Sequence, residues 1–163
     1  MTASPLSRRH FEAWSTWLVA VALLGGCERG GPPAPPVEYM PVAGNPQLPF
    51  SEAVRVGHLL FLSGQLGTDS TGRLTAGGIA AETRQALENI RRVLDRHGSS
   101  LGQVVKCTAM LADIKEWGAM NEVYVTYFRG HLPARSAFGT TGLVMGARIE
   151  LECWATVSDP PAR

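Results

Sequence analysis

Two side chains near the C-terminal end of the sequence are the best candidates for chemistry. Arg135 lies where a loop enters an expected strand, and Glu150 stands fifteen residues later in another expected strand. A guanidinium at the mouth of a sheet suits a planar carboxylate, because its fork donates two parallel charge-assisted hydrogen bonds. Arg135 is therefore a candidate for binding a small carboxylate. Glu150 is a candidate because the strand pattern turns it away from the apolar face.

Other motifs that mark a catalytic or cofactor site do not occur in the sequence. There is no phosphate-binding loop, no dinucleotide-binding fingerprint, no nucleophile elbow and no histidine pair at metal-ligand spacing. The three cysteines have no zinc-site spacing. His58, His97 and His131 stand alone and are expected at the surface or in turns. We therefore expect neither a metal nor a cofactor.

The composition of the 163-residue chain excludes several classes of protein. It has 45% hydrophobic residues, 18 Gly, 11 Pro and a formal net charge of +1. These values exclude a disordered, collagen-like or strongly basic chain. Because the chain has no basic excess, we expect no nucleic-acid partner.

Residues 1–26 have the pattern of a secretory signal peptide, and Cys27 follows them. An arginine pair gives a basic start, and the apolar run over 17–24 is shorter than the ~20 residues that span a bilayer. The Leu-Gly-Gly-Cys of 24–27 resembles the lipobox of bacterial lipoproteins. The resemblance implies an exported protein with a lipid anchor on Cys27, on a membrane that faces the periplasm or the cell exterior. The alternative is a cytosolic protein with a misassigned start.

The rest of the chain divides into a tether, one domain and a short tail. Residues 27–47 are rich in proline and glycine, which favours an extended spacer. Residues 48–157 are long enough for one domain with its own core, and residues 158–163 form the tail. We expect the tether to link the lipidated cysteine to the domain.

Hydrophobic periodicity predicts an α+β domain with the element order β-β-α-β-α-β-β. A turn at Gly57 and His58 separates the first two strands, and an amphipathic helix from Ile79 ends before Gly98. The remaining elements are a strand over 104–111, a helix after Asp113, a short strand over 136–138 and a closing strand over 148–157. We expect one mixed sheet with both helices on one face.

Alternation in the closing strand indicates that both faces of the sheet are covered. Its apolar positions share one face, and these are Ile149, Leu151, Cys153 and Ala155. Glu150, Glu152 and Trp154 share the other face. A tryptophan among acids on that face favours a second subunit as its cover.

Cys107 and Cys153 both fall in expected core strands. Buried free thiols are the commoner state of such cysteines, and they are our expectation here. The alternative is a disulfide bond between the two residues, formed in an oxidising compartment.

Several segments together resemble the Rid (YjgF-type) family of reactive-intermediate deaminases. They are 61–65, 82–90, 105–108, Asn121 with Tyr124, the Pro-Ala-Arg-Ser of 133–136 and the Arg-Ile-Glu-Leu-Glu of 148–152. The last two segments, at their spacing, are the most specific part. The likeness covers residues 48–157 and none of the tether. It implies a chorismate-mutase-like fold and a homotrimer with active sites in the clefts between subunits.

The resemblance also implies an activity, the hydrolytic deamination of 2-imino or enamino acids to 2-keto acids and ammonia without a cofactor. Substrates of this class include 2-iminopropanoate and 2-iminobutanoate. Arg135 would bind the substrate carboxylate, and Glu150 would orient or activate the attacking water. Ser63 and Gly64 would line the pocket floor, and Asn121 would support its wall. The partners implied are a small imino acid, or another carboxylate, and further copies of the chain.

Three departures from the family pattern fall in the expected site. Phe50, in the substrate-binding set, stands where the deaminase branch commonly has a tyrosine, so a hydroxyl is missing. Ala137 replaces a reactive cysteine found in many members. The segment between Asn121 and Arg135 is a few residues shorter than in typical deaminases.

The alternative function is a lipid-tethered, non-catalytic trimer that binds a small carboxylate. A ribonuclease activity, attached to some relatives, is disfavoured by the near-neutral charge.

Overall fold

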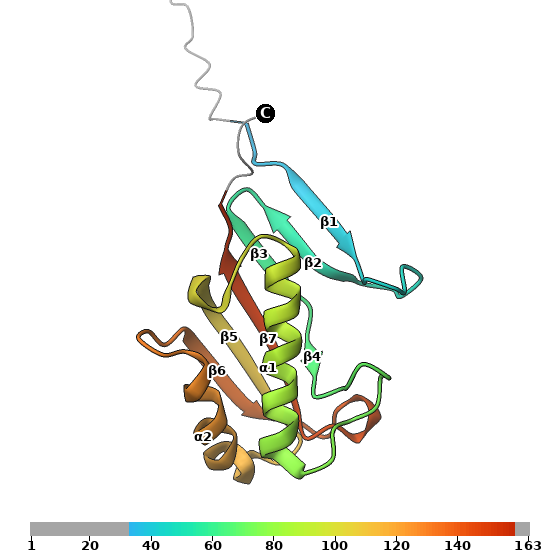
Figure 1. Ribbon diagram of the computed structural model, residues 1–163, viewed down its shortest axis with the longest axis vertical. Coiled ribbons are helices and arrows are strands. Elements are labelled where there is room, and N and C mark those ends of the chain that lie inside the picture. Colours follow the sequence, from blue (N-terminus) through green and yellow to red (C-terminus); the bar gives the residue numbers. More distant parts are fainter. Residues whose placement is uncertain (1–32, 159–163) are drawn as a thin grey trace, which may run out of the picture. The chain divides into compact units, whose positions relative to one another are not determined.

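The strands of the protein form a mixed sheet in the computed structural model, which describes residues 33–158 (Figure 1). They are β1 (Val37–Pro41), β2 (Ser51–Val56), β3 (Leu59–Leu62), β4 (Gln65–Leu66), β5 (Val104–Leu111), β6 (Ala134–Gly139) and β7 (Ile149–Thr156). Their order across the sheet is β1-β2-β3-β7-β5-β6, and β4 also pairs with β7. β5 and β6 run parallel, and the other pairs are antiparallel.

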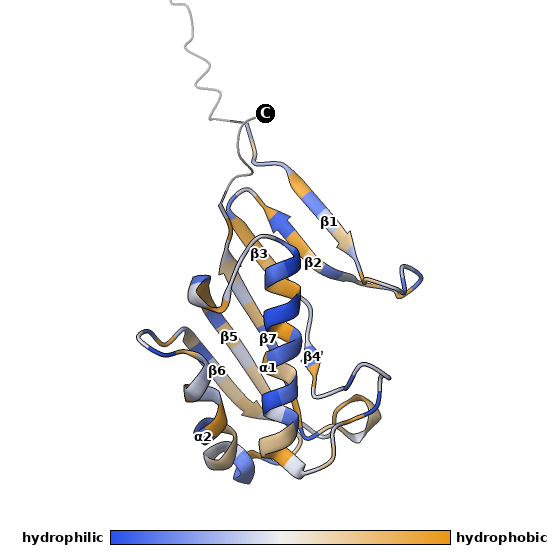
Figure 2. Ribbon diagram, in the orientation of Figure 1, coloured by the Kyte–Doolittle hydropathy of each residue, from blue (hydrophilic) through white to orange (hydrophobic). Residues whose placement is uncertain are grey.

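Two helices, α1 (Gly78–Arg96) and α2 (Trp117–Tyr127), cover one face of this sheet (Figure 1). Leu87 and Ile90 of α1 are fully buried in one cluster with Leu151 of β7. The outer side of α1 is mainly hydrophilic, as Figure 2 shows. The predicted α+β architecture, with two helices on one face of a mixed sheet, is therefore confirmed. Within residues 33–158, no helix is long and apolar enough to cross a membrane.

Strand β1 lies in a segment that the sequence predicts as tether. The proline and glycine content of residues 27–47 favours a spacer, but Val37–Pro41 pairs antiparallel with β2. β1 is an edge strand whose proline stands at its last position, and an edge tolerates proline because one side of the strand has no ladder. The domain therefore begins before residue 48. Cys27, the predicted signal peptide over 1–26 and residues 159–163 lie outside the described residues.

Cys107 of β5 and Cys153 of β7 form a disulfide bond, and both residues are fully buried. They are direct register partners in the antiparallel β5–β7 pair, on the face that the helices cover. The expectation of free thiols is therefore wrong. Register between strands that are distant in sequence decides which side chains face each other, and the alternation that predicts each strand does not contain that information.

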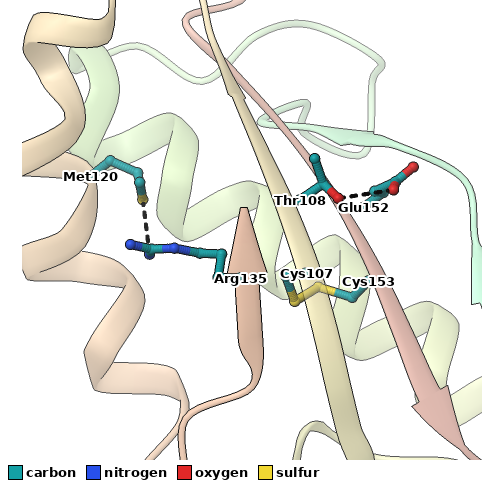
Figure 3. Close-up of a disulfide and its surroundings, with 6 residues drawn as sticks. All are labelled: Cys107, Thr108, Met120, Arg135, Glu152 and Cys153. Atoms are coloured by element: carbon teal, nitrogen blue, oxygen red, sulfur yellow. Dashed lines mark hydrogen bonds between the residues drawn. A yellow bond between two sulfur atoms is a disulfide. The ribbon is translucent and has the colours of Figure 1, made fainter. Parts of the chain in front are cut away.

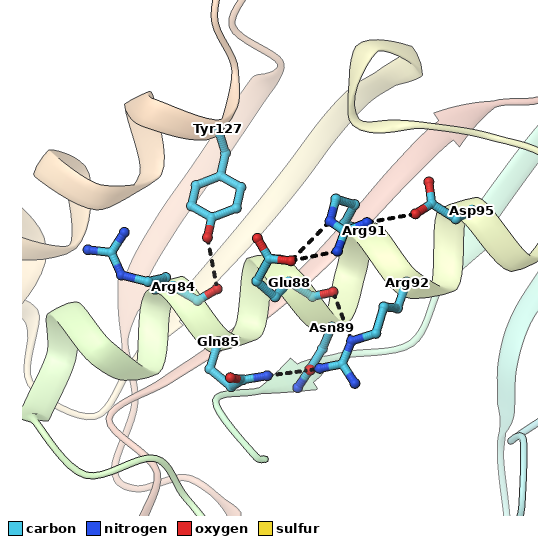
Figure 4. A network of polar contacts seen from close by, with 8 residues as sticks. All are labelled: Arg84, Gln85, Glu88, Asn89, Arg91, Arg92, Asp95 and Tyr127. Atoms are coloured by element: carbon cyan, nitrogen blue, oxygen red, sulfur yellow. Dashed lines mark hydrogen bonds and ion pairs between the residues drawn. The ribbon is translucent and has the colours of Figure 1, made fainter. Parts of the chain in front are cut away.

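The outer face of α1 carries a network of ion pairs and hydrogen bonds (Figure 4). Arg91 pairs with Glu88 and with Asp95, each at 2.9 Å. Tyr127 of α2 donates its hydroxyl to the carbonyl oxygen of Arg84 at 3.4 Å, which links the two helices. Exposed ion pairs of this kind contribute little to stability. We therefore interpret this face as a solvated surface.

Candidate active site

Arg135 is the second residue of β6, and its side chain projects toward α2 (Figure 3). The guanidinium carbon lies 4.5 Å from the ring centre of Tyr124 and 5.8 Å from that of Trp117. Nη1 donates to Sδ of Met120 at 3.8 Å. Among residues 33–158, Arg135 has no carboxylate partner. Aromatic faces and a thioether hold the cation without neutralising it, so it is available to an anion.

Two buried oxygens on α2 have no hydrogen-bond partner within the described chain. They are Oδ1 of Asn121 and the hydroxyl of Tyr124, which stand three residues apart on the helix. Burial raises the pKa of Tyr124 to about 12, although Arg135 acts in the opposite direction. The phenol therefore stays protonated and able to donate. Unpaired buried polar groups are costly, and the Tyr124 ring lies against Arg135, so its hydroxyl is a candidate partner for a bound water.

Tyr124 is absent from the predicted site, because an aromatic residue at helical spacing is more often a core residue. Its ring does pack in the core, against Phe128 at 4.7 Å between ring centres. Its position three residues after Asn121 is the signal that could have found it, since residues at that spacing share one helix face.

Glu150 of β7 lies between its register partners Met110 of β5 and Leu66 of β4. Burial and, second, the charge of Glu152 raise the pKa of Glu150 above its ordinary value. A raised pKa brings a carboxylate nearer to the range in which it exchanges protons at neutral pH. Gly64 lies against this carboxylate, and a Cβ at Gly64 would collide with it. A larger residue at position 64 would require the Glu150 side chain to move.

Arg135 and Glu150 leave the sheet on opposite faces. Arg135 is the register partner of Cys107, whose side chain lies in the helix-covered core. Glu150 shares the other face with Glu152, which accepts a hydrogen bond from Thr108 at 3.0 Å (Figure 3). One protomer therefore presents two separate half-sites. The arginine half-site is Arg135 with Tyr124, and Asn121 lies three residues before Tyr124 on α2. The glutamate half-site is Glu150 with Gly64, with Ser63 next in the chain and Phe50 on the wall of the cavity that Gly64 lines.

The glutamate half-site brings together residues that the sequence places in the pocket. Phe50 and Gly64 both line a cavity of about 310 Å³. Ser63 precedes Gly64 and donates its hydroxyl to the carbonyl oxygen of Ser51 at 2.6 Å. That bond fixes the chain where it turns from β3 into the loop. Asn121 and Arg135, by contrast, do not reach this cavity.

The departure at Ala137 has a structural counterpart. Ala137 is a partly buried residue packed against the core, on the same face of β6 as Arg135. No thiol stands at this position, so the arginine half-site has no redox-sensitive group there. In the part of the chain that the structure describes, no three His, Cys, Asp or Glu side chains are grouped to hold a metal ion.

The sequence and the fold both match known proteins. A family profile described as endoribonuclease L-PSP matches residues 41–157. A rat protein named 2-iminobutanoate/2-iminopropanoate deaminase is 47% identical over 107 residues, which are 65% of this chain and 78% of the relative.

Solved structures give the same answer for the fold. A crystal structure of the yeast protein YEO7 matches with a TM-score of 0.67 and 37% identity, over 77% of this chain and 98% of the yeast chain. A crystal structure of TdcF from E. coli with bound serine matches with a TM-score of 0.64 and 29% identity, over 68% of this chain and 89% of that chain. The profile match over 41–157 includes both half-sites. The chain therefore belongs to the endoribonuclease L-PSP family, the Rid (YjgF-type) family that its sequence motifs indicate.

Proposed function

We propose that the protein is a hydrolytic deaminase that converts 2-imino acids of the 2-iminopropanoate and 2-iminobutanoate type to 2-oxo acids and ammonia. The observation that carries the proposal is the guanidinium of Arg135, which lies against Tyr124 and Trp117 with no carboxylate partner in residues 33–158. Such a cation suits the carboxylate that every 2-imino acid carries. The rat relative is named for this reaction.

The reaction needs one water molecule and a group that moves its proton. The water oxygen adds to the imine carbon, and its proton passes to the imine nitrogen, which gives a carbinolamine. The carbinolamine then loses ammonia as its hydroxyl becomes the carbonyl of the 2-oxo acid. Glu150, with its raised pKa, accepts the proton from water and returns it to nitrogen. Arg135 holds the carboxylate so that the imine carbon stays beside the water.

A complete site needs both half-sites, and we propose that two subunits of a homotrimer supply them. Arg135 and Glu150 lie on opposite faces of one sheet, so a single protomer does not present both to one substrate. The open face also carries Trp154, which is 41% exposed and packs edge-on against Phe61 at 4.9 Å between ring centres. A partly exposed aromatic pair of this kind is typical of a subunit interface. In this arrangement Arg135 of one subunit faces Glu150 of the next.

We also propose that the protein is exported and anchored by a lipid on Cys27. The Leu-Gly-Gly-Cys segment over 24–27 and the apolar run before it support export. The Cys107–Cys153 disulfide bond supports it independently, because structural disulfides form and persist in oxidising compartments and are rare in the reducing cytosol. The test is a radiolabelled palmitate incorporation assay on the full chain, in which Cys27→Ala is expected to lose the label.

The deaminase proposal is tested by 2-oxo acid release from 2-iminobutanoate generated in place by an amino-acid oxidase. We expect the full chain to accelerate release above the spontaneous rate, and Arg135→Ala to remove the acceleration. Arg91→Ala is the matched control, because Arg91 makes only surface ion pairs. A folded trimer with no acceleration would contradict the proposal and favour a non-catalytic protein that binds small carboxylates.

A further inference from the structure

We infer that the cavity beside Gly64 is a side-chain pocket that selects 2-imino acids with apolar side chains of three or more carbons. The inference deepens the proposed function and rests on it for the identity of the substrate. It concerns the part of the substrate that Arg135 and Glu150 do not touch.

The position of the cavity ties it to the reacting atoms. Gly64 lines the cavity and at the same time lies against the carboxylate of Glu150. The imine carbon must sit beside Glu150 for water to attack it, and the side chain leaves from that same carbon. The carboxylate end of the substrate points to Arg135 of the neighbouring subunit. The open volume that adjoins Gly64 is therefore the space for the side chain.

The lining of the cavity is mainly apolar. Its apolar members come from the β1–β2 loop, β4 and the β6–β7 loop, and they are Val42, Leu48, Phe50, Leu66 and Met145. Phe50 contributes a ring without the hydroxyl that a tyrosine would add. An aliphatic side chain that enters this space leaves water for apolar surface, and each buried methylene contributes about 0.8 kcal/mol.

Two polar side chains that line the cavity, those of Glu52 and Gln65, are already engaged. Glu52 is 8% exposed and accepts from Arg96 at 2.5 and 2.6 Å, and His97 lies 3.1 Å from its second oxygen. Gln65 donates its side-chain amide to the carbonyl oxygen of Ser63 at 3.2 Å. A charged substrate side chain would therefore find no free counter-charge on Glu52. The pocket favours apolar substituents over basic ones.

The size of the cavity exceeds what a small substrate fills. Its volume is about 310 Å³. A water molecule takes about 30 Å³ of liquid volume, so a methyl or ethyl side chain leaves most of this space to solvent. A side chain of three or four carbons fills more of it and gains the corresponding burial.

Met145 lies at the rim of the pocket and has a left-handed backbone conformation. Its φ is 62°, and it is the only residue other than glycine with positive φ among those described. Strained backbone of this kind concentrates at ligand-binding sites. The Met145 side chain is 57% exposed, and an unbranched thioether adapts to ligands of different length. Met145 is thus placed to close over the end of a bound side chain.

The first test is calorimetric binding of stable 2-oxo acids to the full chain. The probes are pyruvate, 2-oxobutanoate, 2-oxopentanoate and 2-oxohexanoate, which share the carboxylate and differ by one methylene each. We expect Kd to fall by up to about fourfold per methylene, and at least tenfold from the first probe to the last. Kd values that agree within twofold across the series, Kd values that rise with chain length, or no measurable binding of 2-oxohexanoate would overturn the inference.

The second test uses two lysine substitutions on one turn. Met145 lines the cavity, whereas its neighbour Val144 is 70% exposed and does not line it. We expect Met145→Lys to reduce the ratio of Kd for pyruvate to Kd for 2-oxohexanoate by at least fivefold, and Val144→Lys to leave that ratio unchanged. Equal effects of the two substitutions would contradict the assignment of Met145 to the pocket.

Imine hydrolysis by the same proteins separates this inference from the proposed function. If 2-iminopropanoate is hydrolysed and Kd does not change along the 2-oxo acid series, the side-chain pocket is refuted and the deaminase function is supported. If no imine is hydrolysed and Kd still falls with chain length, the pocket is supported and the deaminase function is refuted.

Discussion

Cys107 is at once the disulfide partner of Cys153 on β7 and the register partner of Arg135 on β6. The strand that carries Cys107 therefore lies between the strand of Arg135 and the strand of Glu150. One covalent bond in the core fixes β5 against β7, and parallel pairing fixes β6 against β5. The bond thus helps to set the spacing of the two half-sites within a protomer.

Removal of the disulfide is expected to destabilise the fold strongly. The two cysteines are 46 residues apart in sequence, and a cross-link over a loop of that length contributes about 4 kcal/mol to the free energy of unfolding. The variant Cys107→Ala/Cys153→Ala should show this loss in urea unfolding. A reductant should lower the stability of the native protein and leave the variant unchanged. Equal stability of the oxidised protein and the variant would contradict a structural role for the bond.

Replacement of Arg135 by lysine is expected to lower kcat/KM for 2-iminobutanoate by about 10- to 100-fold. An ammonium cannot donate two parallel hydrogen bonds to a carboxylate, and it does not stack on Tyr124 as a planar guanidinium does. The measurement is the acceleration of 2-oxo acid release, with Arg91→Lys as the surface control. Wild-type kcat/KM in Arg135→Lys would show that bidentate binding is not used.

Glu150→Gln is expected to reduce turnover at least 100-fold, because an amide does not accept a proton from water. Its affinity for a 2-oxo acid should be equal or higher, since one negative charge near the ligand carboxylate is removed. Glu152→Gln is the matched control on the same face, where Glu152 is engaged with Thr108. Activity that survives in Glu150→Gln would refute the role assigned to that residue.

The pH dependence of activity should follow the ionisation of Glu150. As a base it works only when ionised, and burial together with the charge of Glu152 raises its pKa. Activity should therefore fall as pH drops through a value above that of an ordinary glutamate. In Glu152→Gln one of the two causes is gone, so the acidic limb of the kcat/KM profile should move to lower pH. An acidic limb that does not move would contradict the coupling of the two carboxylates.

Ionisation of Glu150 should affect stability and activity in opposite directions. A carboxyl whose pKa is raised by folding favours the folded state when protonated, and this contribution is lost as pH rises through the folded pKa. Glu150→Gln should therefore unfold at a higher temperature than the native protein near neutral pH, and the difference should shrink in acid. Thermal unfolding at several pH values measures this, and a difference that grows in acid would have the wrong sign.

The sequence predicts those elements whose periodicity is strong. The helical spacing of Leu87 and Ile90 and the alternation along β7 reflect burial on one side, so both appear in the sequence as patterns. Strand β1 is not predicted, because it lies in a segment rich in proline and glycine and only its pairing with β2 identifies it as a strand. The two-residue β4 is too short to carry any period.

The features of the candidate site also differ in how far the sequence predicts them. Arg135 and Glu150 are identifiable because their segments are specific, and Gly64 because the family resemblance implies it. Their separation onto two faces depends on register, which no single segment records. The cavity rim at Met145 depends on one turn conformation, and the sequence contains no pattern that predicts a positive φ for methionine.

The edge position of β1 has a mechanical consequence. Within the sheet β1 pairs with β2 alone, and its Met40 also packs against the core. A pulling force applied to the chain before residue 37 acts on this pairing before it acts on the disulfide-linked strands. The loop after β1 contributes Val42 and Leu48 to the side-chain pocket. Tension on the N-terminal side would therefore open the pocket before it disturbs the core.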